Sequence, residues 1–192
     1  MSNLMNAIEA LTQRVSVAQL TGPEPTAEQQ RLMLTAALRA PDHAWLRPSR
    51  YLTVRGDARE TLGRVFLESS DNWQGLAEDK KNKLLSMPMR APLIIVAVCR
   101  ITEHQKVPRD EQLLSTGAGV QNILNAAFAL GLGAIWRTGD LAVNPKVAEA
   151  LGLDECEEIV GFVYVGQINS SLKPVPELNV DDFVTDWAAK TS

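Results

Sequence analysis

The chain has 192 residues, of which 45% are hydrophobic and 22% are charged. This balance is typical of a globular protein with its own core, and it excludes disorder over the bulk of the chain. The formal net charge is −4 at pH 7, so no overall field attracts nucleic acid or an anionic membrane surface. Any bound phosphate must therefore be held by a few well-placed cations.

Apolar residues recur at helical spacing in six stretches, separated by short β-rich runs. The spacing predicts helices over residues 3–15, 26–39, 57–69, 73–87, 109–130 and 144–152, and strands over 51–54, 93–100, 134–137 and 158–165. Thr26 and Gln29 have the capping-box pattern, and Asn144 with Pro145 forms an N-cap and N1 pair. Two of the helices therefore have well-defined starts.

The helix over 109–130 is the longest, and its second half, GAGVQNILNAAFAL, is apolar almost all round. A helix without a polar face must be covered on every side, by its own domain or by a second subunit. The run over 93–100 is continuously apolar, as in a strand buried on both faces. Helices flanking a few buried strands indicate an α+β or three-layer α/β fold, and we expect a single domain over residues 1–192.

The few cysteines and histidines restrict the metal chemistry. Cys99, Cys156, His43 and His104 form no CxxC motif and no Cys/His cluster, which argues against a structural zinc site. The N-terminus lacks the pattern of a signal peptide, and the longest apolar runs are too short to span a membrane. We expect a cytoplasmic protein with no membrane or nucleic-acid partner.

Motifs that identify common catalytic sites are missing from the sequence. There is no GxxxxGK[ST] loop, no GxGxxG after a strand, no GxSxG elbow and no HExxH. These absences argue against P-loop, dinucleotide-type Rossmann, serine hydrolase and zinc protease sites. These absences favour a bound cofactor as the source of the difficult chemical step, with the protein supplying binding and orientation.

Polar and cationic side chains gather in three segments at the ends of regular elements: residues 13–16, 39–43 and 136–139. Arginine offers a bidentate fork for phosphate, and serine or threonine adds a hydroxyl donor. Such residues at chain turns suit the phosphate and ring edge of a flavin mononucleotide.

The helix ending in Arg-x-Ser, the RAPDH break, KVPRDEQ, GLGAIWRTG and IVGFVYVG occur in this order along the chain. Over about residues 7–183 the chain thereby resembles the FMN-dependent nitroreductase family, above all its short members. The resemblance implies a three-layer α/β/α fold with a central, mostly antiparallel sheet. It also implies a homodimer with FMN at the subunit interface, and residues 167–192 as a C-terminal extension that packs on the partner subunit.

The resemblance also implies site residues. Contacts to FMN are expected from Arg14, Val15, Ser16, Arg39, His43, Trp136, Arg137 and Thr138. A weaker correspondence suggests contacts to the pyridine nucleotide from Ala126, Ala127, Phe128, Ala129, Leu130 and Gly131.

The chain departs from the family pattern at several of these places. Val15 replaces a second basic residue, Ala18 replaces a polar or basic one, and residues 45–49 read WLRPS where Asn-x-Gln-Pro-Trp is common. A cation near the N1/C2 carbonyl edge stabilises the negative charge of reduced flavin. Because Ala18 cannot supply it, we predict that Arg47 does.

Each candidate also has a purely structural interpretation. Arg14 and Arg39 follow helices, where the dipole favours a cation regardless of any ligand. His43 could be a turn histidine paired with its neighbour Asp42. Trp136 could be a core residue, and the polar residues before the helix at 109 are typical of a solvated helix start.

The leading hypothesis is an FMN-dependent NAD(P)H oxidoreductase that reduces nitroaromatic, quinone or similar electron-poor acceptors by ping-pong hydride transfer. Such a scheme requires no protein acid or base, and we assign no catalytic side chain and no metal ligand. One alternative is a flavin-binding or sensory protein with little turnover. Another is a small helical interaction module that only self-associates.

Overall fold

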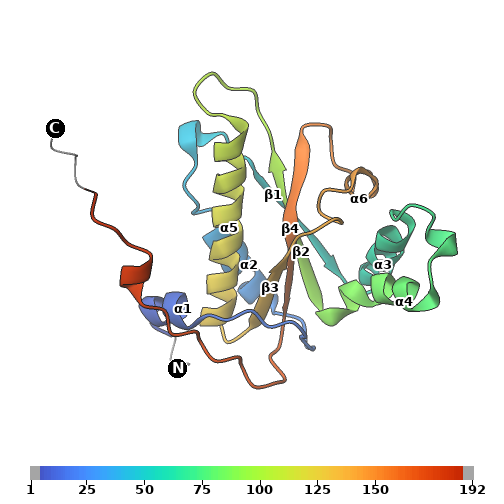
Figure 1. Cartoon of the computed structure of the whole chain (residues 1–192), viewed down its shortest axis with the longest axis horizontal. Helices are drawn as coiled ribbons and strands as arrows, with labels where there is room; N and C mark the ends of the chain where they lie inside the picture. Colours follow the sequence, from blue (N-terminus) through green and yellow to red (C-terminus); the bar gives the residue numbers. More distant parts are fainter. Residues whose placement is uncertain (1–4, 188–192) are drawn as a thin grey trace.

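A computed structural model describes residues 5–187, and Figure 1 shows a sheet between two groups of helices. The α-helices are α1 (Ala7–Gln13), α2 (Ala27–Ala37), α3 (Ala58–Glu68), α4 (Glu78–Ser86), α5 (Arg109–Ala129) and α6 (Pro145–Ala150). The strands are β1 (Ser49–Arg55), β2 (Leu93–Arg100), β3 (Gly133–Arg137) and β4 (Glu157–Gly166). Short 3-10 helices are η1 (His43–Trp45), η2 (Trp73–Gly75), η3 (Met87–Arg90) and η4 (Val180–Asp182).

The sheet has the strand order β1-β2-β4-β3, and every neighbouring pair is antiparallel. Ile95 of β2 lies opposite Thr53 of β1 and Val163 of β4, so β2 is flanked on both sides. Its residues 93–99 are all buried, as the continuous apolar run predicts. The antiparallel sheet between helical layers confirms the predicted fold.

Alternate residues of the central strands face two separate hydrophobic cores. On one face, α2 and α5 cover the sheet through Met33, Ala37, Val120, Ile123, Leu124 and Ala127, against Leu93, Ile95, Ala97, Val163 and Val165. On the other face, α3 and α6 pack through Leu62, Phe66 and Val147 against Ile94, Val96, Val98, Phe162 and Tyr164. The sheet is therefore covered on both sides, and α5 belongs to the helical layer on one of its faces (Figure 1).

Several element boundaries follow the capping residues. The Thr26 side chain caps α2 in a complete capping box with Gln29, and Asn144 caps α6. The helix predicted over 73–87 is wrong as a single element, because Leu76 and Ala77 have extended backbones that separate η2 from α4. Helix α1 ends at Gln13 rather than at residue 15, and residues 3 and 4 of that predicted helix lie outside the described residues.

After β4 the chain leaves the sheet and runs along the outside of the molecule (Figure 1). Ile168 still packs against the core, but from residue 172 to 187 the large apolar side chains are exposed: Leu172, Val175, Leu178, Val180, Phe183, Val184 and Trp187. Residues 188–192 of the predicted extension lie outside the described part. Within residues 5–187, no helix combines the length and the apolar character that crossing a bilayer requires.

Candidate functional site

The segment that follows α1 lies beside the edge strand β3. The Val17 amide donates to the Ala134 carbonyl oxygen at 3.1 Å, and Arg137 Nη2 donates to the Ala18 carbonyl oxygen at 3.4 Å. Arg14, the C-cap of α1, stands at the start of this segment with an extended backbone. The structure thus brings two of the predicted segments, 13–16 and 136–139, into one corner, and we call residues 14–18 and 136–138 the cation corner.

Two guanidinium nitrogens in the cation corner are buried without a hydrogen-bond partner among the described residues. They are Nη1 of Arg14 and Nε of Arg137. A buried donor of a charged group that lacks a partner lowers the stability of the protein, so such atoms indicate a site where a ligand supplies the acceptor. An anion with several acceptor oxygens, such as the phosphate of FMN, fits this donor set.

Arg137 is held from two sides. Its guanidinium carbon lies 5.5 Å from the centroid of the Tyr164 ring, while Nη2 contacts Ala18. Burial raises the pKa of Tyr164, with the charge of Arg137 acting in the opposite direction, so the phenol stays neutral beneath the cation. The exposed Ser16 and Thr138 stand next to these residues in the chain and offer hydroxyl donors at the same corner.

A cavity of about 380 Å³ adjoins the cation corner. Arg137 and Thr138 line it together with apolar side chains of the core that α3 and α6 cover, among them Phe66, Met87 and Leu141. Trp136, the neighbour of Arg137, also lines this cavity, while its Nε1 donates to the Val160 carbonyl oxygen at 3.2 Å and its ring packs closely on Gly161. This packing supports the structural interpretation of Trp136, although a contact to the cofactor stays a prediction.

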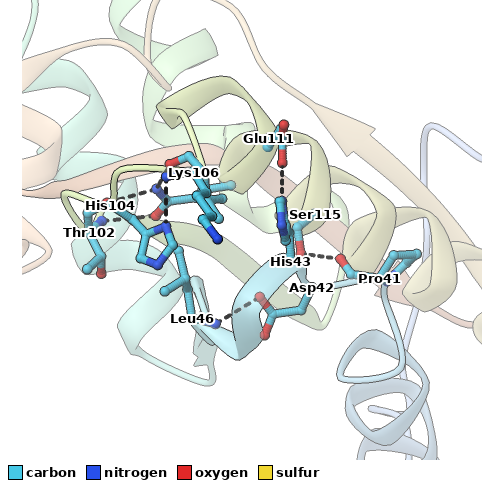
Figure 2. A network of polar contacts seen from close by, with 11 residues as sticks. Pro41, Asp42, His43, Leu46, Thr102, His104, Lys106, Glu111 and Ser115 are labelled. Carbon is cyan, nitrogen blue, oxygen red and sulfur yellow. Dashed lines mark hydrogen bonds and ion pairs between the residues drawn. The ribbon is translucent and has the colours of Figure 1, made fainter.

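The break after α2 forms a second group, tied to the N-terminal half of α5 (Figure 2). His43 Nδ1 lies 2.8 Å from Glu111 Oε2, and Ser115 Oγ donates to the Pro41 carbonyl oxygen at 2.6 Å. The carboxylate partner of His43 is therefore Glu111, and the pairing with Asp42 considered from the sequence is wrong. Arg39 is exposed at the start of this break.

Asp42 has a different function, since its carboxylate caps the turn. It accepts hydrogen bonds from the backbone amides of Leu46 at 3.1 Å and Arg47 at 2.9 Å. Arg47 is largely exposed, its Nε lies 3.7 Å from Asp42 Oδ2, and its guanidinium carbon lies 5.8 Å from the centroid of the Trp45 ring. We call residues 39–47 the ring segment, because its predicted contacts include the flavin ring.

Within one chain the cation corner and the ring segment are not brought together. In Figure 1, α1 lies near the C-terminal end of α5. The ring segment, which leads to β1, lies near the N-terminal end of α5. Helix α5 has 21 residues and is therefore about 30 Å long.

The stretch predicted to contact the nucleotide forms the end of α5 and the following turn. Ala127 and Phe128 are buried in the core, whereas Ala126, Ala129 and Leu130 are half-buried. Gly131 has a φ of 75°, which favours glycine at this helix end. Any contact to a ligand would come from the residues that are not in the core.

Sequence reasoning did not anticipate the conformation of the ring segment. Ala44, Trp45 and Arg47 have left-handed backbones with φ of 59°, 55° and 54°, although none is glycine. The motif RAPDHAWLRP marks a break, but side-chain identity does not predict this conformation for alanine, tryptophan or arginine. The support that Tyr164 gives to Arg137 was also missed, since it depends on the pairing of β3 with β4.

The family model of the nitroreductase family matches residues 11–167. A provisionally named NAD(P)H nitroreductase, YdjA of Escherichia coli strain K12, is 41% identical over 184 residues, covering 94% of this chain and 99% of that protein. A nitroreductase-like family protein from Bacillus cereus has a solved structure that matches with a TM-score of 0.85 at 25% identity, covering 98% of this chain and all of the other.

A structure from Desulfovibrio desulfuricans, provisionally assigned as a nitroreductase and solved with FMN, matches with a TM-score of 0.71 at 22% identity. It covers 95% of this chain and 97% of the other. The three-layer fold with its antiparallel sheet is thus the nitroreductase-like fold. The chain belongs to the nitroreductase family, and the resemblance found in the sequence is confirmed.

Proposed function

We propose that this protein is an FMN-dependent NAD(P)H oxidoreductase that reduces nitroaromatic compounds, quinones or similar electron-poor acceptors. Membership of the nitroreductase family and 41% identity to a relative named as an NAD(P)H nitroreductase support this assignment. The FMN in a structure of the same fold supports the choice of cofactor.

The observation that carries the proposal is the pair of buried, unpaired guanidinium nitrogens of Arg14 and Arg137. Both belong to segments that the family resemblance assigns to the cofactor. Phosphate oxygens would satisfy these donors, and the hydroxyls of Ser16 and Thr138 would add neutral hydrogen bonds. The protein would thus hold FMN by its phosphate end at the cation corner.

We propose a homodimer, because the two groups lie toward different ends of α5 within one chain. The cation corner of one chain and the ring segment of a second chain would together enclose one FMN. The exposed apolar side chains of Ile8, Leu11 and Leu114, and those of the C-terminal segment, supply surface for such an association. We propose that the segment from residue 167 onward packs on the partner subunit.

Bound FMN would supply the redox chemistry by taking a hydride from NAD(P)H and returning two electrons to an acceptor that occupies the same place afterwards. The protein residues bind and orient the reactants. Arg47 would place a positive charge at the pyrimidine edge of the ring and stabilise developing negative charge there. The uncovered residues at the end of α5 would contact the nucleotide.

The direct test is the flavin content and turnover of the purified protein. We expect a yellow protein that releases FMN on denaturation, identified by absorbance and chromatography, and that oxidises NAD(P)H in steady state with a nitroaromatic or quinone acceptor. Bound FMN with negligible NAD(P)H oxidation would instead favour the flavin-binding or sensory alternative. A colourless protein that does not bind added FMN would contradict the proposal.

A further inference from the structure

The ring segment holds three strained residues within four positions. Ala44, Trp45 and Arg47 all have φ between 54° and 59°, a region that favours glycine. Two amide hydrogen bonds to the Asp42 carboxylate fix the turn that contains them. Strain of this kind persists only where the surroundings determine it, and it gathers at ligand-binding positions.

The strained backbone presents Trp45 to solvent. Its side chain is 78% exposed, so burial of the indole within the chain does not explain the conformation. Among the described residues, the aromatic and cation–π contacts of this ring comprise the Arg47 guanidinium alone, at 5.8 Å. A large, rigid aromatic surface is thereby held outward beside a cation.

The residues just before Trp45 line two cavities. A cavity of about 340 Å³ is lined by Pro41, His43 and Leu114, and a second of about 520 Å³ includes Ala44 and Lys106. Both cavities thus adjoin the residues that immediately precede Trp45. His43 and Arg47, the proposed contacts of the flavin ring, are its near neighbours.

We infer that Trp45 is a specificity-determining residue that stacks on planar, electron-poor aromatic acceptors while they receive electrons. The inference rests on the proposed function and names the part of the site that selects the acceptor. The indole face is electron-rich, and an offset stack with an electron-poor ring is favourable. An acceptor without an aromatic ring gains nothing from this contact.

The variant Trp45→Gly tests the inference, since it removes the ring and relieves the strain together. We expect kcat/KM for 1,3-dinitrobenzene to fall about 3- to 10-fold, the range of an aromatic pair, while kcat/KM for ferricyanide stays unchanged. Trp45→Phe keeps an aromatic face and should recover most of the lost kcat/KM. The Tm of Trp45→Gly should stay the same or rise by up to about 4 °C.

Asn72→Gly is the matched control, because Asn72 also has a left-handed backbone, with φ of 52°, but precedes η2 away from the ring segment. It should leave both kcat/KM values unchanged. A lower Tm, an altered oligomeric state, or an equal loss with both acceptors in Trp45→Gly would show a structural role and overturn the inference. If the wild type binds no FMN, the proposed function itself fails. If the wild type binds FMN and turns over but Trp45→Gly gives one of these results, only the inference about Trp45 fails.

Discussion

At the scale of single residues, the unpaired guanidinium nitrogens of the cation corner destabilise the free protein and can bind an anion. Arg14 and Arg137 each bury one guanidinium nitrogen without a partner among the described residues. The stacking of Arg137 on Tyr164 and its contact with the Ala18 carbonyl oxygen limit the orientations that its side chain can adopt. A preorganised donor loses less conformational entropy when the anion binds.

Arg137→Gln should weaken the binding of FMN by about 10- to 100-fold, because a charge-assisted hydrogen bond contributes about 1.5–3 kcal/mol. Riboflavin lacks the phosphate, and its affinity should change little. Fluorescence titration of the apoprotein with both flavins measures the two affinities. The exposed Arg64 on α3 provides the control variant Arg64→Gln. Equal losses for FMN and riboflavin would contradict a phosphate contact.

We propose that Arg47 stabilises the negative charge of the reduced flavin ring rather than binding the phosphate. Arg47→Ala should make the reduction potential of bound FMN more negative by about 30 mV, equivalent to about 1.4 kcal/mol for a two-electron couple. Redox titration against a reference dye gives this value. An unchanged potential together with unchanged flavin affinity would exclude this assignment for Arg47.

At the scale of elements, an ion pair joins β1 to the start of β4. Arg50 donates from Nε and Nη2 to the two carboxylate oxygens of Glu157 at 2.7 and 2.6 Å, and the Glu157 side chain is only 4% exposed. The hydrogen bond from Arg50 lowers the pKa of Glu157 from its ordinary value of 4.5. The charged carboxylate is therefore the form that the fold prefers.

Glu157→Gln should lower the free energy of unfolding by about 1–3 kcal/mol at pH 7. Because the folded pKa of Glu157 is lowered, its contribution is complete above the ordinary value of 4.5 and disappears as the pH falls through the folded value. Urea denaturation at pH 7 and near pH 3 should thus show a difference between variant and wild type that shrinks on acidification. The exposed Glu103, changed to Gln, is the control, and a pH-independent difference would count against the ion pair.

Close packing of α5 against its neighbours depends on one glycine. A Cβ at Gly119 would overlap the Tyr51 hydroxyl and lie 3.2 Å from the Ala37 carbonyl oxygen, whereas at Gly117 the nearest atom is 3.6 Å away on Trp136. At Gly119, α5 therefore packs closely against α2 and β1.

Gly119→Ala should destabilise the protein by about 1–3 kcal/mol, because the added methyl forces its neighbours apart. Gly117→Ala, on the same helix, should be neutral or stabilise by up to about 1 kcal/mol through helix propensity. Thermal and denaturant unfolding of the two variants measure the contrast. Equal effects would show that the packing at Gly119 is looser than the structure indicates.

The sequence predicts the elements better than their details. The capping box at Thr26 and the apolar run over 93–100 depend on local patterns, and both agree with the structure. The break at Leu76 interrupts a continuous helical pattern, so local spacing does not reveal it. The pairing of His43 with Glu111 joins residues 68 positions apart, and only tertiary structure determines such a contact.

At the scale of the whole molecule, we propose that the site forms between two chains. The cation corner and the ring segment stand toward opposite ends of α5, so a two-fold symmetric dimer would build two sites, each from one corner and one segment. The family resemblance predicted both groups of residues from the sequence. No local pattern in the sequence predicts that the two groups lie apart within one chain.

Mixing two defective variants tests this arrangement most directly. Arg14→Gln/Arg137→Gln damages the cation corner, and Arg39→Ala/Arg47→Ala damages the ring segment. After subunit exchange of the two proteins, each mixed dimer should contain one intact site and one doubly damaged site. With random exchange, tight FMN binding should return in about a quarter of all sites. If the exchanged mixture binds FMN as weakly as its parents, the site lies within one chain and the account is wrong.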